Sequence, residues 1–182
     1  MRSTWRLFVA AYPPAEWSAS ALGLLGGLPL AGLRPTPAPQ VHLTLHFLGE
    51  VDQSALGQVE ESIRNACGGI TPFFIEPRAL RSLPARGVVR ALVIETSAPP
   101  SLLELHARLS HRFRRGRKSG GRDTYTPHLT LARFAPAKAP STQVQFPVAL
   151  GGFSVTCVSL VRSVLHPEGA EHRVLATVPL GA

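Results

Sequence analysis

Two histidine–threonine pairs are the residues of this sequence best suited to chemistry. The tetrapeptide His-Leu-Thr-Leu occurs at His42–Leu45 and again at His128–Leu131. Each copy lies in a short apolar run, and side chains two residues apart in a β-strand share a face. The imidazole and the threonine hydroxyl of each copy would therefore face one side, while its two leucines enter a core. The sequence predicts two matched half-sites.

Two imidazoles and two hydroxyls suit a reaction at phosphorus. Hydrolysis or transesterification there needs one proton removed from the attacking oxygen and another given to the leaving oxygen. An ordinary histidine titrates near pH ~6.5, so one imidazole can be the neutral base and the other the protonated acid. Thr44 and Thr130 could donate hydrogen bonds to the non-bridging oxygens as charge builds. Arg133, five residues after His128, would add charge-assisted bonds if the strand twist brings it round.

Other arrangements of reactive residues fail on their spacing. His42 and His46 are four apart, as in helical zinc sites, but in a strand they would lie about 13 Å apart on one face and could not chelate one ion. We expect His46 to be a solvated strand residue within reach of a substrate, and His106 and His111 to be surface residues of a helix. No nucleophile elbow, phosphate loop or acidic pair for two-metal catalysis occurs. The sequence predicts neither a metal nor a cofactor.

Composition bounds the class of protein and its partners. The chain has 182 residues, 45% of them hydrophobic and 16% charged, as in a globular protein. Its formal charge of +8 comes almost entirely from arginine, since Lys118 and Lys138 are the only lysines. This excess favours a polyanionic partner such as RNA, although arginine-biased codon usage would produce it too. Without a signal peptide, a membrane span or a metal-ligating cysteine pair, we expect a monomeric cytoplasmic protein that does not bind membranes.

The elements that must hold the two pairs alternate between strands and helices. Strands are expected at 5–12, 41–49, 73–75, 88–96, 127–134, 144–150, 153–165 and 173–180. Helices are expected at 15–28, at 52–67 with Asp52 as the N-cap, and from residue 100, with an apolar stripe of leucines. Residues 34–39 would form an extended connector and 76–87 a basic loop.

The two tetrapeptides divide the chain into halves of similar pattern. We predict an α+β fold that is bilobal and duplicated about a pseudo-two-fold axis, with mostly antiparallel sheets, helices outside and a central cleft. Residues 1–182 would form a single domain.

The densest positive segment follows the third helix. We expect four of its side chains to contact RNA beyond the scissile phosphate: Arg114, Arg115, Arg117 and Lys118. A solvated helix end whose charges offset the helix dipole would explain the same cluster without RNA.

The motifs resemble those of the two-histidine phosphoesterase superfamily, and most closely its RNA 2′,3′-cyclic phosphodiesterases, also called 2′-5′ RNA ligases. The similar segments are the opening strand Trp5–Ala10, the two motifs His42–Gly49 and Pro127–Arg133, and the closing segment from Arg162 to Ala170. The resemblance implies a metal-independent enzyme whose substrate is RNA or a nucleotide with a 2′,3′-cyclic phosphate end, which it opens to a 2′-phosphomonoester.

The resemblance also assigns roles by motif position. His42 would be the proton donor to the leaving 3′-oxygen, and His128 the proton acceptor that activates water. Thr44 and Thr130 would hold the phosphate, supported by Arg133. Two alternatives stay open: a physiological 2′-5′ RNA ligase acting on tRNA halves, and a non-catalytic RNA-binding protein.

Three departures from the family pattern affect residues that could stack on a base. Arg34-Pro35 stands where Arg-Trp is frequent, His172 replaces a frequent Tyr, and Arg90 lies where an aromatic residue is usual. These positions bear on RNA preference and leave the phosphate chemistry untouched. An arginine plane could still stack on a base.

Overall fold

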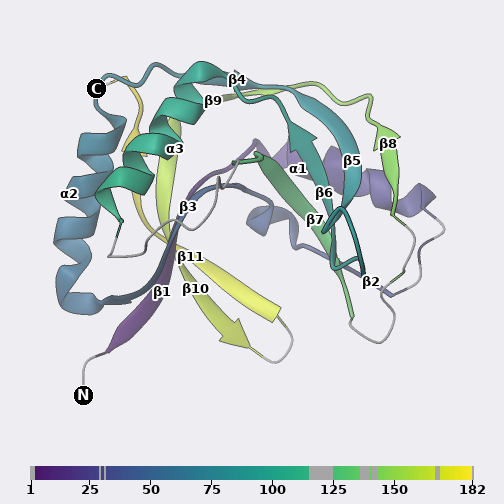
Figure 1. The fold of residues 1–182 in the computed structure, drawn as a ribbon, viewed down its shortest axis with the longest axis horizontal. Coiled ribbons are helices and arrows are strands. Elements are labelled where there is room, and N and C mark those ends of the chain that lie inside the picture. Colours follow the sequence, from purple (N-terminus) through teal and green to yellow (C-terminus); the bar gives the residue numbers. More distant parts are fainter. Residues whose placement is uncertain are drawn as a thin grey trace.

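The structure is a computed structural model that describes residues 3–28, 30, 32–114, 125–135, 140, 143–166 and 169–181. Its strands form a nine-stranded antiparallel sheet and a separate two-stranded sheet (Figure 1). The strands are β1 (Thr4–Ala11), β2 (Leu33–Pro35), β3 (Leu43–Asp52), β4 (Phe73–Ile75), β5 (Pro77–Leu83), β6 (Ala91–Thr96), β7 (His128–Phe134), β8 (Gln145–Pro147), β9 (Phe153–Val155), β10 (Cys157–His166) and β11 (Gly169–Pro179).

Two lobes meet at the centre of the large sheet. The strand order is β11-β10-β1-β3-β7-β6-β5-β8, with β2 paired to β7 outside this path. The strands β3 and β7 pair at one position only, Leu43 opposite Leu129. On either side of this junction the strands diverge, as Figure 1 shows. The predicted bilobal α+β fold with antiparallel strands is confirmed.

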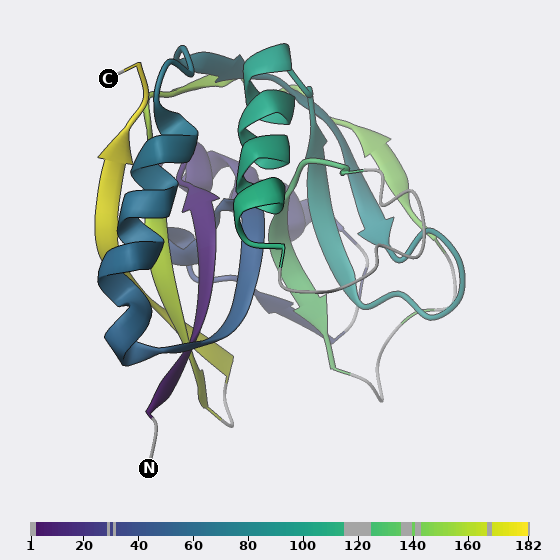
Figure 2. The same cartoon turned by 60° about the vertical axis from the view of Figure 1, so that its left-hand side comes forward.

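Among the described residues, three α-helices accompany the strands: α1 (Ala15–Gly23), α2 (Leu56–Cys67) and α3 (Pro100–Arg112). Helices α2 and α3 pack side by side against the lobe formed by β11, β10, β1 and β3. Helix α3 contacts β3, and α2 contacts β11 (Figure 2). The predicted stripe of α3 is fully buried at Leu102, Leu105 and Leu109, since these residues recur on one helical face. Helix α1 is tied down by Trp17, whose indole N–H donates to the Gly151 carbonyl.

The leucines of both tetrapeptides lie in the core, as the alternation predicted. Leu43, Leu45, Leu129 and Leu131 are at most 1% exposed and belong to one hydrophobic cluster that includes residues of both lobes. The side chains between them are only partly buried. The junction therefore has a closed apolar side and an accessible polar side.

The prediction of a basic loop at 76–87 is wrong for most of this segment. Residues Pro77–Leu83 form β5, which pairs with β6 and β8. Leu80 and Ser82 are buried while their neighbours are more exposed, which is the alternation of a strand with one covered face. The prolines that indicated a loop mark only its ends.

Smaller differences concern element ends. The first helix ends at Gly23 and continues as a short 3₁₀ turn, and the strand expected at 153–165 is broken between Val155 and Cys157. Asp52 is a cap as predicted, because its carboxylate accepts from the Ser54 N–H. The element that it caps is a 3₁₀ turn that leads into α2.

Candidate active site

Both histidine–threonine pairs line one cavity, of about 490 Å³, at the junction of the lobes. We call it the two-histidine cleft, and it contains His42, Thr44, His128, Thr130 and Arg133. The antiparallel pair Leu43–Leu129 has a local two-fold axis, so each histidine lies toward the threonine of the other strand. The pairing thus places two equivalent half-sites about one point.

A β-bulge brings Arg133 into this cleft. Strict alternation would place Arg133 on the buried face, since it is five residues from His128. The register between β6 and β7 skips Leu131, and both Leu131 and Ala132 are buried. This extra residue reverses the alternation and moves Arg133 to the face of His128. The sequence predicted the contribution of Arg133 only on the condition that the strand turned it round.

The first tetrapeptide contains the equivalent bulge. The register between β1 and β3 skips Leu45, so Phe47 lies on the cleft face, five residues after His42. Phe47 is 66% exposed and occupies the place that corresponds to Arg133 in the second half. The two half-sites therefore differ: one ends in an aromatic ring and the other in a guanidinium.

The same bulge turns His46 away from the cleft. Its ring stacks on Phe113 with 5.9 Å between the ring centroids, and its Nδ1 lies 3.3 Å from the Ser110 hydroxyl of α3. The expectation that His46 shares the face of His42 is therefore wrong. It rested on strict alternation, which the bulge interrupts.

The expectation that His106 is a surface residue is also wrong, because this side chain is half-buried behind β3. Its Nδ1–H donates to the Leu45 carbonyl at 2.7 Å, and its ring stacks on Tyr125 with the centroids 3.9 Å apart. The Tyr125 hydroxyl donates to the Thr44 carbonyl at 2.8 Å. Burial raises the pKa of Tyr125, which keeps this phenol a donor. Two side chains thus hold consecutive carbonyls of the first tetrapeptide.

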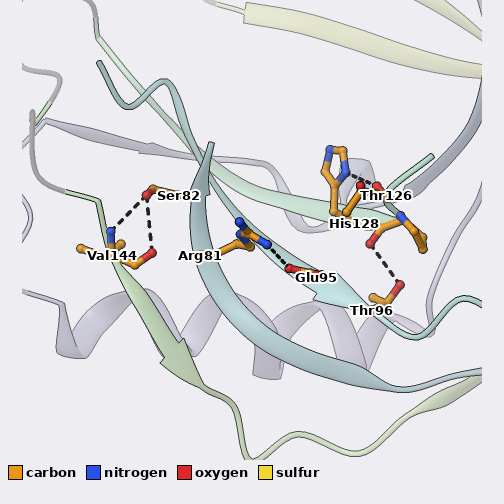
Figure 3. A network of polar contacts seen from close by, with 8 residues as sticks. Arg81, Ser82, Glu95, Thr96, Thr126, His128 and Val144 are labelled. Carbon is orange, nitrogen blue, oxygen red and sulfur yellow. Dashed lines mark hydrogen bonds and ion pairs between the residues drawn. The ribbon is translucent and has the colours of Figure 1, made fainter. Parts of the chain in front are cut away.

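The two imidazoles of the cleft are held in the same way. The Nδ1 of His42 lies 2.6 Å from the Gln40 carbonyl. The Nδ1 of His128 lies 2.8 Å from the Thr126 carbonyl, a contact that Figure 3 shows. A carbonyl can only accept, so each Nδ1 carries the hydrogen. Each Nε2 is then a lone-pair base in the neutral ring and an N–H acid in the protonated ring. The arrangement supports one proton acceptor and one proton donor.

The surroundings of His42 change its pKa. Burial lowers the pKa of His42 to about 4, against a smaller opposing effect of the Gln40 carbonyl, and the nearby His172, Arg133 and His128 lower it further. His42 is therefore neutral at pH 7. A bound phosphate anion would supply the negative charge that favours its protonated form.

A third imidazole, that of His172 on β11, borders the cleft. Its ring centroid lies 5.1 Å from that of His42 and 5.0 Å from that of Phe8, with both rings edge-on. Burial, and then Arg133, lower its pKa. Its Nδ1 is buried, and no hydrogen-bond partner for it occurs within the described residues. The departure noted at His172 thus places a third imidazole beside His42.

A model of the 2′-5′ RNA ligase superfamily matches residues 29–166. The chain belongs to this superfamily. It is 32% identical over 182 residues to the RNA 2′,3′-cyclic phosphodiesterase of Thermus thermophilus. This alignment covers 93% of this chain and 87% of that protein. The protein of the same name from Methanothermobacter thermautotrophicus is 30% identical over 71% of this chain and 72% of its own length.

The fold of this superfamily member agrees with a solved structure. The crystal structure of TT0787 from T. thermophilus superposes with a TM-score of 0.80 at 31% identity, over 96% of this chain and 97% of that one. Both tetrapeptides are described in our structure and fall within the matched segment 29–166.

The other predicted contacts lie mostly outside what the structure describes. Arg114 is exposed just after α3, whereas Arg115, Arg117 and Lys118 fall outside the described residues. The RNA-contact role of this segment stays a prediction. In the described part of the chain no three His, Cys, Asp or Glu side chains are grouped as metal ligands. No helix there is long and apolar enough to cross a membrane.

Removing the Tyr125 hydroxyl tests the support behind β3. We expect Tyr125→Phe to lower the free energy of unfolding by about 1 kcal/mol, because the ring stays in place while the bond to the Thr44 carbonyl is lost. Urea unfolding measures this change. Ser110→Ala is the control, since it removes a contact to His46 that holds neither carbonyl. Equal stability of Tyr125→Phe and the wild type would show that the bond contributes nothing.

The low pKa of His42 predicts a pH-dependent stability. Between pH ~6.5 and about 4 the unfolded chain binds a proton at His42 that the folded chain does not, so the free energy of unfolding falls as the pH falls through this window. His42→Gln lacks this contribution, which amounts to up to about 3 kcal/mol. Urea unfolding of both proteins at pH 7 and pH 4.5 should show the variant losing less stability.

The matched control for this comparison is His111→Gln, which removes an exposed imidazole of α3. It should follow the wild type at both pH values. If His42→Gln also followed the wild type, His42 would not be buried in its neutral form.

Proposed function

We propose that the protein is an RNA 2′,3′-cyclic phosphodiesterase. It would hydrolyse RNA or nucleotide ends that carry a 2′,3′-cyclic phosphate to 2′-phosphomonoesters, without a metal ion. The observation that carries this proposal is the pair of imidazoles, each with its Nδ1 on a carbonyl two residues before it, facing one cavity. Two relatives, matched over 93% and 71% of this chain, bear the name of this activity, which supports the substrate class.

The reaction is an in-line displacement at phosphorus. His128 Nε2 takes a proton from water as the water oxygen bonds to phosphorus, and the bond between phosphorus and the 3′-oxygen breaks. His42 Nε2–H gives its proton to that oxygen, which leaves a 3′-hydroxyl and a 2′-phosphate. Attacking and leaving oxygens must lie on opposite sides of the phosphorus. A histidine from each of two strands related by a two-fold axis meets this requirement.

The charges around His42 suit a proton donor. An imidazole with a low pKa releases its proton readily once the leaving oxygen develops charge. The substrate phosphate would first raise that pKa, so that His42 is protonated only when a substrate is bound. Arg133 disfavours the protonated ring electrostatically, which favours transfer of the proton to the 3′-oxygen.

The remaining polar groups would bind the phosphate. The hydroxyls of Thr44 and Thr130 border the same cavity and can donate to the two non-bridging oxygens. Arg133 has no carboxylate partner among the described residues, so its guanidinium can pair with the phosphate. Charge that accumulates on these oxygens in the transition state would strengthen all three contacts.

Ligation of RNA ends is the second candidate, since the superfamily is named for it. A 2′-5′ RNA ligase would run the same chemistry backwards, with an RNA 5′-hydroxyl in place of water. Microscopic reversibility exchanges the roles of the two histidines in that direction. The same cleft can therefore serve either reaction.

Product analysis on nucleoside 2′,3′-cyclic phosphates tests the proposal. In the presence of EDTA the wild type should form the nucleoside 2′-phosphate alone. His42→Ala and His128→Ala should each lower kcat by about 10²- to 10⁴-fold, because each removes one proton transfer. His111→Ala, which changes an exposed residue of α3 away from the two-histidine cleft, should keep full activity.

Circular dichroism and thermal melting would check that both variants are folded. Rapid hydrolysis by both variants would rule out the mechanism, and a 3′-phosphate product would rule out the assigned leaving group. Loss of wild-type activity in EDTA would contradict metal independence.

A further inference from the structure

A second cavity, of about 420 Å³, adjoins the two-histidine cleft along β2 and β7. We call it the Arg34 groove, and it is lined among others by Arg34, Thr36, Arg133, His166 and Ala170. Thr36, Arg133 and Ala170 line both cavities. A molecule whose phosphate lies in the two-histidine cleft can therefore extend into this groove.

Two arginines face each other at the boundary between the cavities. Arg34 of β2 lies directly opposite Arg133 of β7 in the antiparallel register, and this register is fixed further by the bond from the Thr36 N–H to the Leu131 carbonyl. Like charges directly opposite each other in a sheet are destabilising. No carboxylate among the described residues pairs with either arginine. Anions bound to the two guanidinium groups would offset this repulsion.

The chemistry of the substrate says where a second anion must lie. A 2′,3′-cyclic phosphate is the 3′ end of its chain, so the RNA continues only through the 5′-oxygen of the same nucleotide. In-line attack places the ribose on the side of the phosphorus away from the water, and hence away from His128. His128 lines the cavities that contain Arg81 and Arg90, but not the Arg34 groove.

On the competing side of the cleft, Arg81 already has an ion-pair partner, whereas Arg90 has none among the described residues. The guanidinium of Arg81 is ion-paired with Glu95 of the neighbouring strand, as Figure 3 shows. Among the described residues that line the Arg34 groove, the one with a carboxylate partner is His166, whose Nε2 lies 3.3 Å from Glu171. Arg34 has no ion-pair partner in the described part of the chain, so its guanidinium can bind a ligand.

We propose that the Arg34 groove is a subsite for the phosphate on the 5′-oxygen of the terminal nucleotide. The inference rests on the proposed function and extends it to the substrate class: a chain with a 5′-linked phosphate is preferred to a bare cyclic nucleoside. Arg34 donates to this second phosphate through its planar guanidinium, while Arg133 serves the cyclic phosphate. The two opposed arginines are then each matched to one anion.

A comparison of two substrates that differ by one phosphate tests the subsite. For the wild type, kcat/KM should be roughly tenfold or more higher for 5′-phosphocytidine 2′,3′-cyclic phosphate than for cytidine 2′,3′-cyclic phosphate. Added salt should reduce this advantage. In Arg34→Gln the advantage should fall to within about threefold, with unchanged turnover of the smaller substrate. In the control Arg90→Gln, at the opposite side of the cleft, it should persist.

Binding measurements separate this proposal from the proposed function. By calorimetry the wild type should bind cytidine 2′,5′-bisphosphate more tightly than cytidine 2′-phosphate, and Arg34→Gln should bind the two alike. Equal affinities in the wild type, or an advantage that Arg90→Gln loses and Arg34→Gln keeps, would overturn the subsite. A wild type that hydrolyses neither cyclic substrate would refute the proposed function, while the calorimetry would still decide whether the groove binds a second phosphate.

Discussion

A single backbone pairing, between Leu43 of β3 and Leu129 of β7, is the constraint on which the rest of the structure depends. Because the pair is antiparallel, it relates the two tetrapeptides by a local two-fold axis. The leucines on one side of the junction join the core of both lobes, and the imidazoles and hydroxyls remain on the other side. Because β3 and β7 pair with each other at no other position, these two strands diverge and leave room for a ligand.

Departures from regular strand geometry turn this symmetric frame into an asymmetric site. Each tetrapeptide has a bulge at its second leucine, which reverses the alternation and brings Phe47 to the cleft in one half and Arg133 in the other. The carbonyls of the bulged leucines are both satisfied, that of Leu45 by His106 and that of Leu131 by the Thr36 N–H. Bulges are thus used here to aim side chains, and other elements stabilise them.

The sequence predicted what local periodicity determines. The two tetrapeptides, the buried leucines and the apolar stripe of α3 follow from periods of two and of 3.6 residues. Strand β5 was missed because prolines at its ends indicated a loop. The bulges depend on the register of a neighbouring strand, so the places of His46 and Arg133 could not follow from their own spacing. His106 and Tyr125 meet only through tertiary packing, and no local pattern indicates their contact.

The central claim is that His42 protonates the leaving 3′-oxygen while His128 activates water. The most direct test replaces the 3′-oxygen of cytidine 2′,3′-cyclic phosphate by sulfur, because a thiolate, with a thiol pKa near ~8.5, leaves without an acid. We expect His42→Ala to hydrolyse the sulfur substrate at close to the wild-type rate, while His128→Ala stays as impaired as on the oxygen substrate. Rescue of His128→Ala in place of His42→Ala, or of neither variant, would contradict the account.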